Sequence, residues 1–415
     1  MTDTYKLIFK LIRAGAMGEE IEVPEKFGSE ILTIARKNGV LSLIAEVLKK
    51  CYDNGTFCVT GQEINSVVFE VSAQVMKYSQ KQYSVSDVIK RLEAFGVPCV
   101  MMKGDILGVM YKKPDLRMSN DTDLFIDVKD EKKCLKFFKN EGAYIKKRTP
   151  SNNQSVIVHP TGGVFEIHIS LDTKQVSEVW YDNMEFITEP YRKVTVAGKY
   201  EYITLGYTDT AIQLALHFIK HFVGGIAHVR MLTDTILFFE TYHSEINHEY
   251  FWKVINHLKF DKIVKSLFFI ANKYFGFTNV ECDEEYCEFA EKLIADIAQC
   301  CEYGYDKLED DGGIYNEYSK KRYNTFMNGD YGKYKKKIVM YDAFELIFKN
   351  KYEMMKLYPV LEKYIVLLPF MYCHRAFKCV FNTVFKKKGV TVPKDKKLTE
   401  LKNKRMKLID EMDML

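Results

Sequence analysis

The sequence predicts an α+β fold in which a small mixed sheet with helices lies between two helical regions. Apolar residues recur at spacings of three and four through the first 95 residues, as at Val67, Val71 and Val75, which is the period of a helix. Between about residues 97 and 200, short apolar runs and two-residue alternation replace that pattern. The helical period returns from about residue 208 and continues to residue 385.

These changes of period divide the chain into four expected segments. They are a helical N-terminal region at residues 1–95, a sheet-containing core at 96–200, a helical C-terminal domain at 201–385 and a basic tail at 386–415. Within the core we expect strands at residues 97–102, 121–128, 155–159 and 164–170, and helices at 105–111 and 130–141. The lysine-rich tail suits contact with RNA or another anion, but a solvated charged helix is the commoner structure for such a sequence.

Composition indicates a folded, soluble protein. Of 415 residues 47% are hydrophobic, and the 60 basic and 56 acidic residues leave a net charge of only +4. This balance argues against a dedicated nucleic-acid-binding protein. Lys6, Lys10 and Arg13 interrupt the first apolar stretch, which therefore differs from a signal peptide, and the ten cysteines form no compact framework. Since no apolar run approaches about 18 residues, we expect a cytoplasmic protein without a membrane span.

Two aspartates mark the first candidate site. In the run from Asn120 to Val128, polar and apolar residues alternate, so the carboxylates of Asp121 and Asp123 leave the same face of a strand. Two residues of strand separate them by roughly 7 Å, a spacing suited to holding a divalent cation. An isolated Asp-x-Asp is common by chance, so its neighbours decide the interpretation.

A second alternating run places Glu166 and His168 together on one face of another strand. If both strands share a sheet and a facing, Glu166 becomes a third carboxylate beside Asp121 and Asp123, and three carboxylates suit Mg²⁺ bridging to a triphosphate. His168 either takes part in the chemistry or simply hydrogen-bonds Glu166 or the backbone.

Basic residues near these acids are candidates for phosphate binding. Lys103 and Gly104 stand at the junction of an apolar strand and a short helix, where backbone amides and an ammonium can face phosphate oxygens. Arg117 can either bind phosphate or pair with a core carboxylate, because its planar fork suits both.

The order of these motifs resembles the polymerase-β-like nucleotidyltransferase superfamily, and within it the uncharacterised bacterial nucleotidyltransferase family. The resemblance is carried by Lys103-Gly104, Tyr111, the segment from Leu116 to Ile126 that contains Arg117, and Glu166-Ile-His168. The abortive-infection toxin nucleotidyltransferases are also similar, through Lys-Gly, Arg117, Ser119 and the two aspartates. The sheet-containing segment at 96–200 would then be the nucleotidyltransferase core.

The resemblance implies transfer of a nucleoside monophosphate from an NTP, which we expect to be ATP, to an acceptor hydroxyl with loss of pyrophosphate. The catalytic and metal-binding residues would be Asp121, Asp123 and Glu166, with Mg²⁺ or Mn²⁺ as cofactor. The expected nucleotide-binding residues are Lys103, Gly104, Arg117, Ser119, His168, His217 and His221. The acceptor is open between a protein, RNA and a small molecule. Two departures from the family pattern are Asp105, which adds negative charge where phosphate is expected, and the lack of Gly-Ser or Gly-Gly at the turn. Asp105 thereby leaves open a degenerate member that binds nucleotide without turnover.

A histidine pair forms the last candidate. His217 and His221 are four residues apart on the polar side of an amphipathic helix, followed by Asp234. They fit either a shared metal or a face that is solvated or lines a cleft, and the resemblance favours the cleft, with this helix bordering the nucleotide site. Two rival functions therefore stay open: a catalytically degenerate nucleotide-binding and helical interaction module, and a His-based metallohydrolase that uses these three residues.

Overall fold

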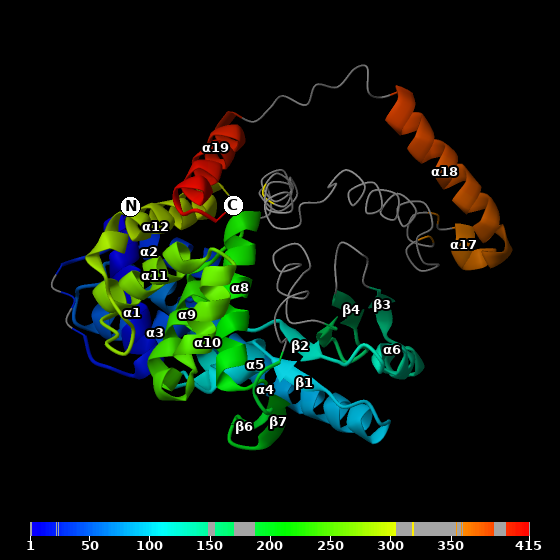
Figure 1. Ribbon diagram of the computed structural model, residues 1–415, viewed down its shortest axis with the longest axis horizontal. Helices are drawn as coiled ribbons and strands as arrows, with labels where there is room; N and C mark the ends of the chain where they lie inside the picture. Colours follow the sequence, from blue (N-terminus) through cyan, green and yellow to red (C-terminus); the bar gives the residue numbers. More distant parts are fainter. Residues whose placement is uncertain are drawn as a thin grey trace.

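The computed structural model describes residues 2–21, 23, 25–147, 154–169, 187–303, 318, 354, 358, 360–385 and 396–414 (Figure 1). Its five-stranded mixed sheet has the order β1-β2-β5-β4-β3, and a separate pair is formed by β6 and β7. The strands are β1 (Val100–Met102), β2 (Asp121–Phe125), β3 (Tyr144–Lys146), β4 (Gln154–Val158), β5 (Val164–His168), β6 (Arg192–Val196) and β7 (Tyr200–Thr204).

Helices precede, interrupt and follow the sheet. The α-helices are α1 (Thr2–Met17), α2 (Glu30–Lys37), α3 (Leu41–Asp53), α4 (Gly61–Ala94), α5 (Gly104–Gly108), α6 (Glu131–Asn140), α8 (Tyr207–Gly224), α9 (Val229–Tyr242), α10 (His248–His257), α11 (Asp261–Ile270), α12 (Cys287–Tyr303), α17 (Val360–Lys363), α18 (Leu368–Phe385) and α19 (Lys396–Glu411). Short turns of helix lie at Pro114–Leu116, His243–Glu245, Ala271–Phe275, Glu284–Tyr286 and Ile365–Leu367. This arrangement confirms the predicted α+β class.

The centre of the sheet is the parallel pair β2 and β5, and every other pairing is antiparallel. Alternation sends Leu124 to one face, where it joins Phe165 and Ile167 of β5 in a core against α6 and the C-terminal half of α4. The aspartates of β2 and Glu166 of β5 therefore share the other face. The two-residue period read from the sequence is the physical cause of this division.

The long helix α4 connects the two parts of the molecule. It begins with a capping box, in which the Thr60 side chain accepts from the Glu63 amide and the Glu63 carboxylate accepts from the Thr60 amide. It ends before Gly96, whose φ of +81° favours glycine. Its first turns pack on the helical core, whereas its last turns pack behind the sheet. At 34 residues it spans about 50 Å, enough to reach both.

The first helices and the later helices form one layer rather than two separate ones. Buried residues of α1, α2 and α3 lie in the same hydrophobic cluster as those of α8, α9, α10, α11 and α12, and Figure 1 shows these helices side by side. The boundaries 1–95 and 201–385 stay a prediction, but the segments that they separate share a core.

Two features of the sheet region were not anticipated. One is the short strand β3, and the other is the hairpin of β6 and β7 at residues 192–204. The sequence analysis placed no strand at either position. Val196 and Tyr202 of the hairpin pack into the core behind the sheet. These strands are stabilised by pairing with a neighbour and by packing against the core, which the sequence pattern alone does not show. Ser170, at the end of one expected strand, lies outside the described residues.

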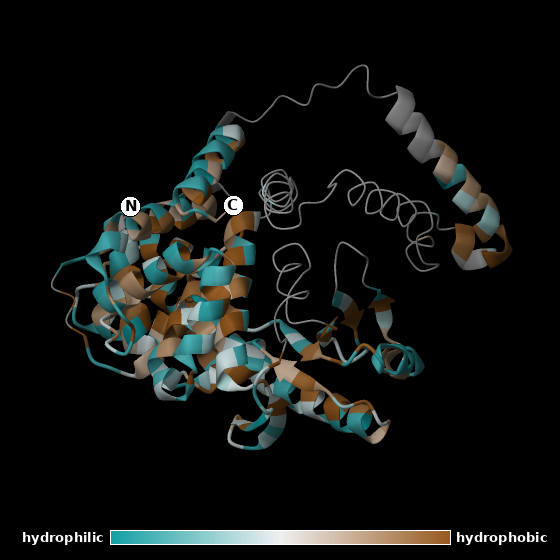
Figure 2. Cartoon of the chain, in the orientation of Figure 1, coloured by the Kyte–Doolittle hydropathy of each residue, from teal (hydrophilic) through white to brown (hydrophobic). Residues whose placement is uncertain are grey.

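The expectation of a solvated tail is corrected over α19. This helix packs on α12, and Leu401, Leu408 and Ile409 are buried. Arg405 is buried as well, because its guanidinium donates to the Asp296 carboxylate of α12 at 3.1 Å. The helix is mainly hydrophilic in Figure 2, and its many lysines made the narrow apolar stripe hard to recognise in the sequence. The lysines at 386–388 and 394 lie outside the described residues.

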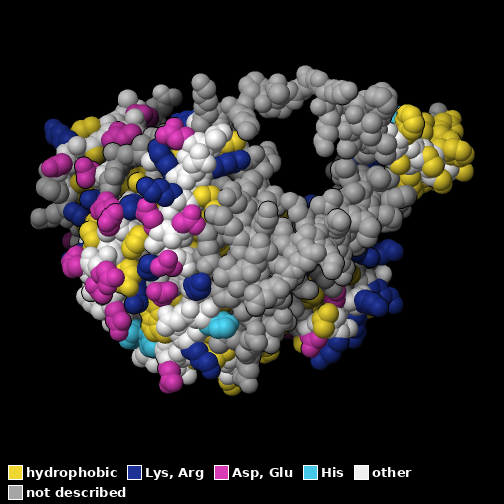
Figure 3. All heavy atoms as spheres, turned by 45° about the horizontal axis from the view of Figure 1, so that its top comes forward, with side chains coloured by type: hydrophobic (Ala, Val, Ile, Leu, Met, Phe, Trp, Pro, Cys, Tyr) yellow, Lys and Arg dark blue, Asp and Glu magenta, His cyan; other side chains and the backbone are white. Residues whose placement is uncertain are grey.

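Acidic and basic side chains are interspersed over the helical part in Figure 3, in keeping with the near-zero charge balance of the sequence. Lys and Arg side chains gather at the lower right edge of this view, with few acidic side chains among them. No helix in the described part of the chain is long and apolar enough to cross a bilayer.

Candidate active site

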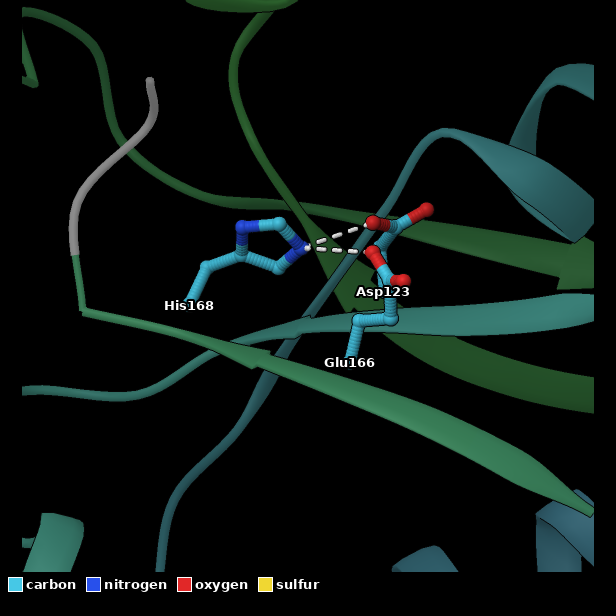
Figure 4. A group of neighbouring side chains, drawn as sticks. All are labelled: Asp123, Glu166 and His168. Carbon is cyan, nitrogen blue, oxygen red and sulfur yellow. Dashed lines mark hydrogen bonds and ion pairs between the residues drawn. The ribbon is translucent and has the colours of Figure 1, made fainter. Parts of the chain in front are cut away.

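The pairing of β2 with β5 brings the predicted acids together. In the parallel register Asp123 lies directly opposite Glu166, and Asp121 lies opposite Val164. Figure 4 shows Asp123, Glu166 and His168 pointing toward one another. Ligand atoms of these three residues all lie within 4.8 Å of one another. The expected convergence of Glu166 with the aspartate strand is confirmed, because both strands share one sheet and one facing.

His168 takes the hydrogen-bonding alternative, although with a different main partner. Its Nε2 lies 2.7 Å from Asp123 Oδ1 and 3.7 Å from Glu166 Oε2. Residues 168 and 123 are both 5% exposed, so this contact is shielded from water. The sequence predicted the common face of Glu166 and His168 but not the closer approach to Asp123, which depends on the register.

Asp121 lies at the start of β2 and lines the adjacent cavity. Burial raises the pKa of its carboxyl, and the negative charges of Asp123 and Glu166 raise it further. Like charges held this close oppose one another, and a divalent cation with oxygen ligands would relieve the repulsion. The cluster of Asp123, Glu166 and His168 is compatible with a divalent metal ion, and Asp121 lines the cavity beside it without belonging to that cluster.

Lys103 reaches the acids from an unusual backbone conformation. Its φ of +45° is rare for a non-glycine residue, and it directs the side chain so that Nζ lies 3.1 Å from Asp123 Oδ1. Burial alone would lower the pKa of this ammonium, but Asp123, Glu166 and Asp121 outweigh it and raise the pKa. For the Asp123 carboxyl, burial alone would raise the pKa, because it disfavours the negative charge. The positive charge of Lys103 and the hydrogen bond from His168 instead hold this pKa well below its usual range.

Gly104 follows with a φ of +35°. A Cβ at this position would lie 3.1 Å from Ser119 Oγ, closer than ordinary van der Waals contact. Both Gly104 and Ser119 line the cavity. The lack of a side chain at Gly104 thus permits a close approach within the protein, between the turn and the segment that leads into β2.

Asp105 does not face the cavity, which answers the concern that it would repel phosphate. It is buried and forms an ion pair of 2.9 Å with Lys81 of α4. The cavity is lined by Lys103 and Gly104 on this turn, and Asp105 is absent from the lining. The sequence contained no signal for this partner, because Lys81 lies 24 residues earlier on a helix with two other lysines, Lys77 and Lys90.

Arg117 adopts the second of its two expected roles and pairs with a buried carboxylate. Its Nε and Nη2 donate to the two oxygens of Asp234 on α9, both at 2.7 Å, and Nη1 donates to the Gly104 carbonyl at 2.7 Å. The Tyr111 hydroxyl also donates to Asp234 at 2.7 Å. This buried group attaches the Lys103-Gly104 turn to the helical layer, and Tyr111 contributes a hydrogen bond to it.

A cavity of about 480 Å³ opens beside the acids. One wall carries Lys103, Ser119 and the three carboxylates, and the opposite wall is formed by α8 and α9. Two cationic residues of that wall, Lys220 and Arg230, had no assigned role in the sequence analysis. Arg230 precedes Asp234 by four residues, a helical spacing that places both on one face. This spacing was the signal from which a role for Arg230 could have been predicted.

The histidine pair borders this cavity, as the resemblance predicted. The rings of His217 and His221 lie edge to face with centroids 4.4 Å apart. Burial lowers the pKa of both imidazoles well below the usual value, with Lys103 and Lys220 adding to the effect. His217 and His221 therefore line the cavity wall, which is the cleft-lining alternative of the sequence analysis.

The same geometry argues against a metallohydrolase built on His217, His221 and Asp234. Both carboxylate oxygens of Asp234 are already bound by Arg117. Within the part of the chain that the structure describes, the cluster suited to a metal ion is Asp123, Glu166 and His168.

We expect stability to fall as the pH drops from 7 to 5, in part because of His228. Burial lowers the pKa of His228 in the folded protein to about 4, whereas the unfolded chain protonates near pH 6.5. Below pH 6.5 the unfolded state therefore takes up a proton that the folded state does not. This imidazole should cost about 2 kcal/mol of unfolding free energy at pH 5. Urea unfolding at both pH values should show a smaller loss for His228→Gln, and equal losses would contradict this.

Comparison with protein families decides the family. A family model described as an uncharacterised nucleotidyltransferase matches residues 28–276, which include both the sheet and the two helices of the cavity wall. The chain belongs to this nucleotidyltransferase family. Membership agrees with the α+β fold and with an acidic cluster compatible with metal binding. Comparisons with curated proteins and with solved structures find no match.

Proposed function

We propose that this nucleotidyltransferase moves a nucleoside monophosphate from an NTP to an acceptor hydroxyl in a reaction that depends on Mg²⁺ or Mn²⁺. The observation that carries the proposal is the register of β2 and β5, which sets Asp123 opposite Glu166 at the edge of a cavity of about 480 Å³. That volume accommodates a small-molecule substrate. The family membership supplies the reaction class.

In this proposal Asp121, Asp123 and Glu166 hold the metal ion, and the bound ion would neutralise charge on the triphosphate. Glu166 also accepts the proton of the attacking hydroxyl. The acceptor oxygen forms a bond to the α-phosphorus while the bond to the β-phosphate oxygen breaks, so pyrophosphate leaves. Catalysis then consists mostly of positioning and charge neutralisation.

The remaining residues divide into two groups. Lys103, Gly104, Ser119, His217 and His221 line the cavity and are proposed to contact the nucleotide, with Lys220 and Arg230 as further cations for the triphosphate. Arg117 and His168 are proposed to act by positioning, because their nitrogen atoms already bind Asp234, the Gly104 carbonyl and Asp123.

The degenerate binding module is the weaker proposal. Its main support in the sequence was Asp105, whose negative charge is neutralised by Lys81 away from the cavity. We further propose ATP as the nucleotide and a cytoplasmic site of action. The acceptor class, whether protein, RNA or small molecule, is left to experiment.

The test is incubation of the purified protein with each α-³²P-labelled NTP, Mg²⁺ and a cell lysate. We expect label in one fraction, separated by protease and nuclease treatment, and we expect Asp123→Asn to lose it. Label that appears equally with the variant, or no transfer from any NTP, would overturn the proposal.

A further inference from the structure

Lys81 of α4 reaches the edge of the candidate site although its helix belongs to neither wall of the cavity. Its Nζ lies 2.9 Å from Asp105 Oδ2 and donates to Ser119 Oγ at 3.0 Å. It also donates to the Asp121 carbonyl at 2.6 Å. The side chain of Lys81 is 13% exposed, so these contacts compete little with water. One ammonium thus joins the Lys103-Gly104 turn to the first residue of β2.

Each partner controls a different part of the site. Asp105 belongs to the helix that begins at Gly104. Ser119 Oγ also donates to the Asp121 carbonyl at 3.1 Å and lies against Gly104, where an added Cβ would be 3.1 Å away. Asp121 carries the carboxylate that opens β2 and lines the cavity. A shift of the ammonium would therefore move the turn, the serine and a proposed metal ligand together.

A simpler role is neutralisation of Asp105, which is 3% exposed and would otherwise be a buried unpaired charge. Two observations go beyond that role. The shortest contact of Lys81 is with the Asp121 carbonyl rather than with the Asp105 carboxylate. A second contact holds the hydroxyl of Ser119, a residue that lines the cavity. A charge that served Asp105 alone would need neither.

We infer that Lys81 is a positioning residue for the metal site, which sets the place of Asp121 and of the Gly104 turn from the distant helix α4. The inference rests on the proposed function, because it assigns Asp121 to metal binding. Lys81 touches neither reacting atoms nor the metal. Its effect is transmitted through the backbone of Asp121, as outer partners of metal ligands orient them in other proteins.

The experiment compares Lys81→Met, Asp105→Asn and the double variant with the unchanged protein. Lys90→Met, an exposed lysine on the same helix, is the matched control. Two quantities are measured in the full chain: the Kd for Mn²⁺ by electron paramagnetic resonance with a non-hydrolysable ATP analogue, and kcat and KM for transfer. The double variant removes the buried unpaired carboxylate that Lys81→Met alone would leave, and thermal unfolding checks that it folds.

If Lys81 positions Asp121, both variants that lack Lys81 should bind Mn²⁺ about 10-fold to 100-fold more weakly and lose kcat by a similar factor. Asp105→Asn should stay within about threefold, because the contacts to Ser119 and Asp121 persist. Mn²⁺ binding restored to normal in the double variant would overturn the inference and assign Lys81 to neutralisation only. If the protein without substitutions neither binds Mn²⁺ nor transfers a nucleoside monophosphate, the proposed function is overturned, and the inference with it.

Discussion

Asp123→Asn is expected to reduce nucleotidyl transfer by more than about 100-fold, beyond the loss typical for outer partners of metal ligands. The residue lies opposite Glu166, and its Oδ1 is bound by His168 and Lys103. Asparagine keeps the shape and an oxygen for both neighbours but removes the negative charge. Because that charge holds the proposed cation, the variant should lose catalysis. The loss of a buried partner of Lys103 has a separate cost in stability, which the thermal midpoint reports.

The measurement is the initial rate of transfer from the labelled NTP at saturating Mg²⁺, alongside the thermal midpoint. Asp127→Asn is the matched control, since Asp127 lies just after β2, is exposed and pairs with Lys129. The control should keep full activity. A comparable rate in Asp123→Asn, with metal present, would remove Asp123 from the mechanism.

Arg117→Ala is expected to lower the free energy of unfolding by about 3–5 kcal/mol, the usual result of breaking a buried ion pair by removing one partner. The guanidinium is 5% exposed and donates to both oxygens of Asp234 and to the Gly104 carbonyl. Truncation leaves the Asp234 carboxylate buried with only the Tyr111 hydroxyl as a remaining donor among these contacts.

Urea unfolding of the full chain measures this loss. The control is Arg36→Ala, because Arg36 also makes a two-contact pair, with Glu70, but in an exposed setting. Exposed pairs contribute about 0–1 kcal/mol, so the control should change little. Similar losses for both variants would show that burial does not govern the Arg117 pair.

The sequence was sufficient for the faces of the strands. Alternation around Asp121 and Asp123, and around Glu166 and His168, correctly predicted which side chains leave the sheet together. It could not predict that β2 and β5 are parallel neighbours with Asp123 opposite Glu166, because register depends on how whole strands pair. The resemblance to a nucleotidyltransferase family supplied only the expectation that Glu166 joins the two aspartates as a third acid.

The polar contacts that fix the site were largely beyond prediction. From the sequence, Asp105 was unfavourable for phosphate binding, but in the structure its carboxylate pairs with Lys81. Arg117 had two possible roles in the sequence, and its ion pair with Asp234 decides between them. These partners are 24 and 117 residues away in sequence. No local period encodes such pairs, since tertiary packing alone brings them together.

The most direct test of the metal site is electron paramagnetic resonance of Mn²⁺ binding to the full chain with a non-hydrolysable ATP analogue. The proposed site predicts saturable binding that depends on the analogue and is lost in both Asp123→Asn and Glu166→Gln. Absence of binding in the unchanged protein, or binding that both variants retain at full strength, would contradict a metal centre formed by β2 and β5.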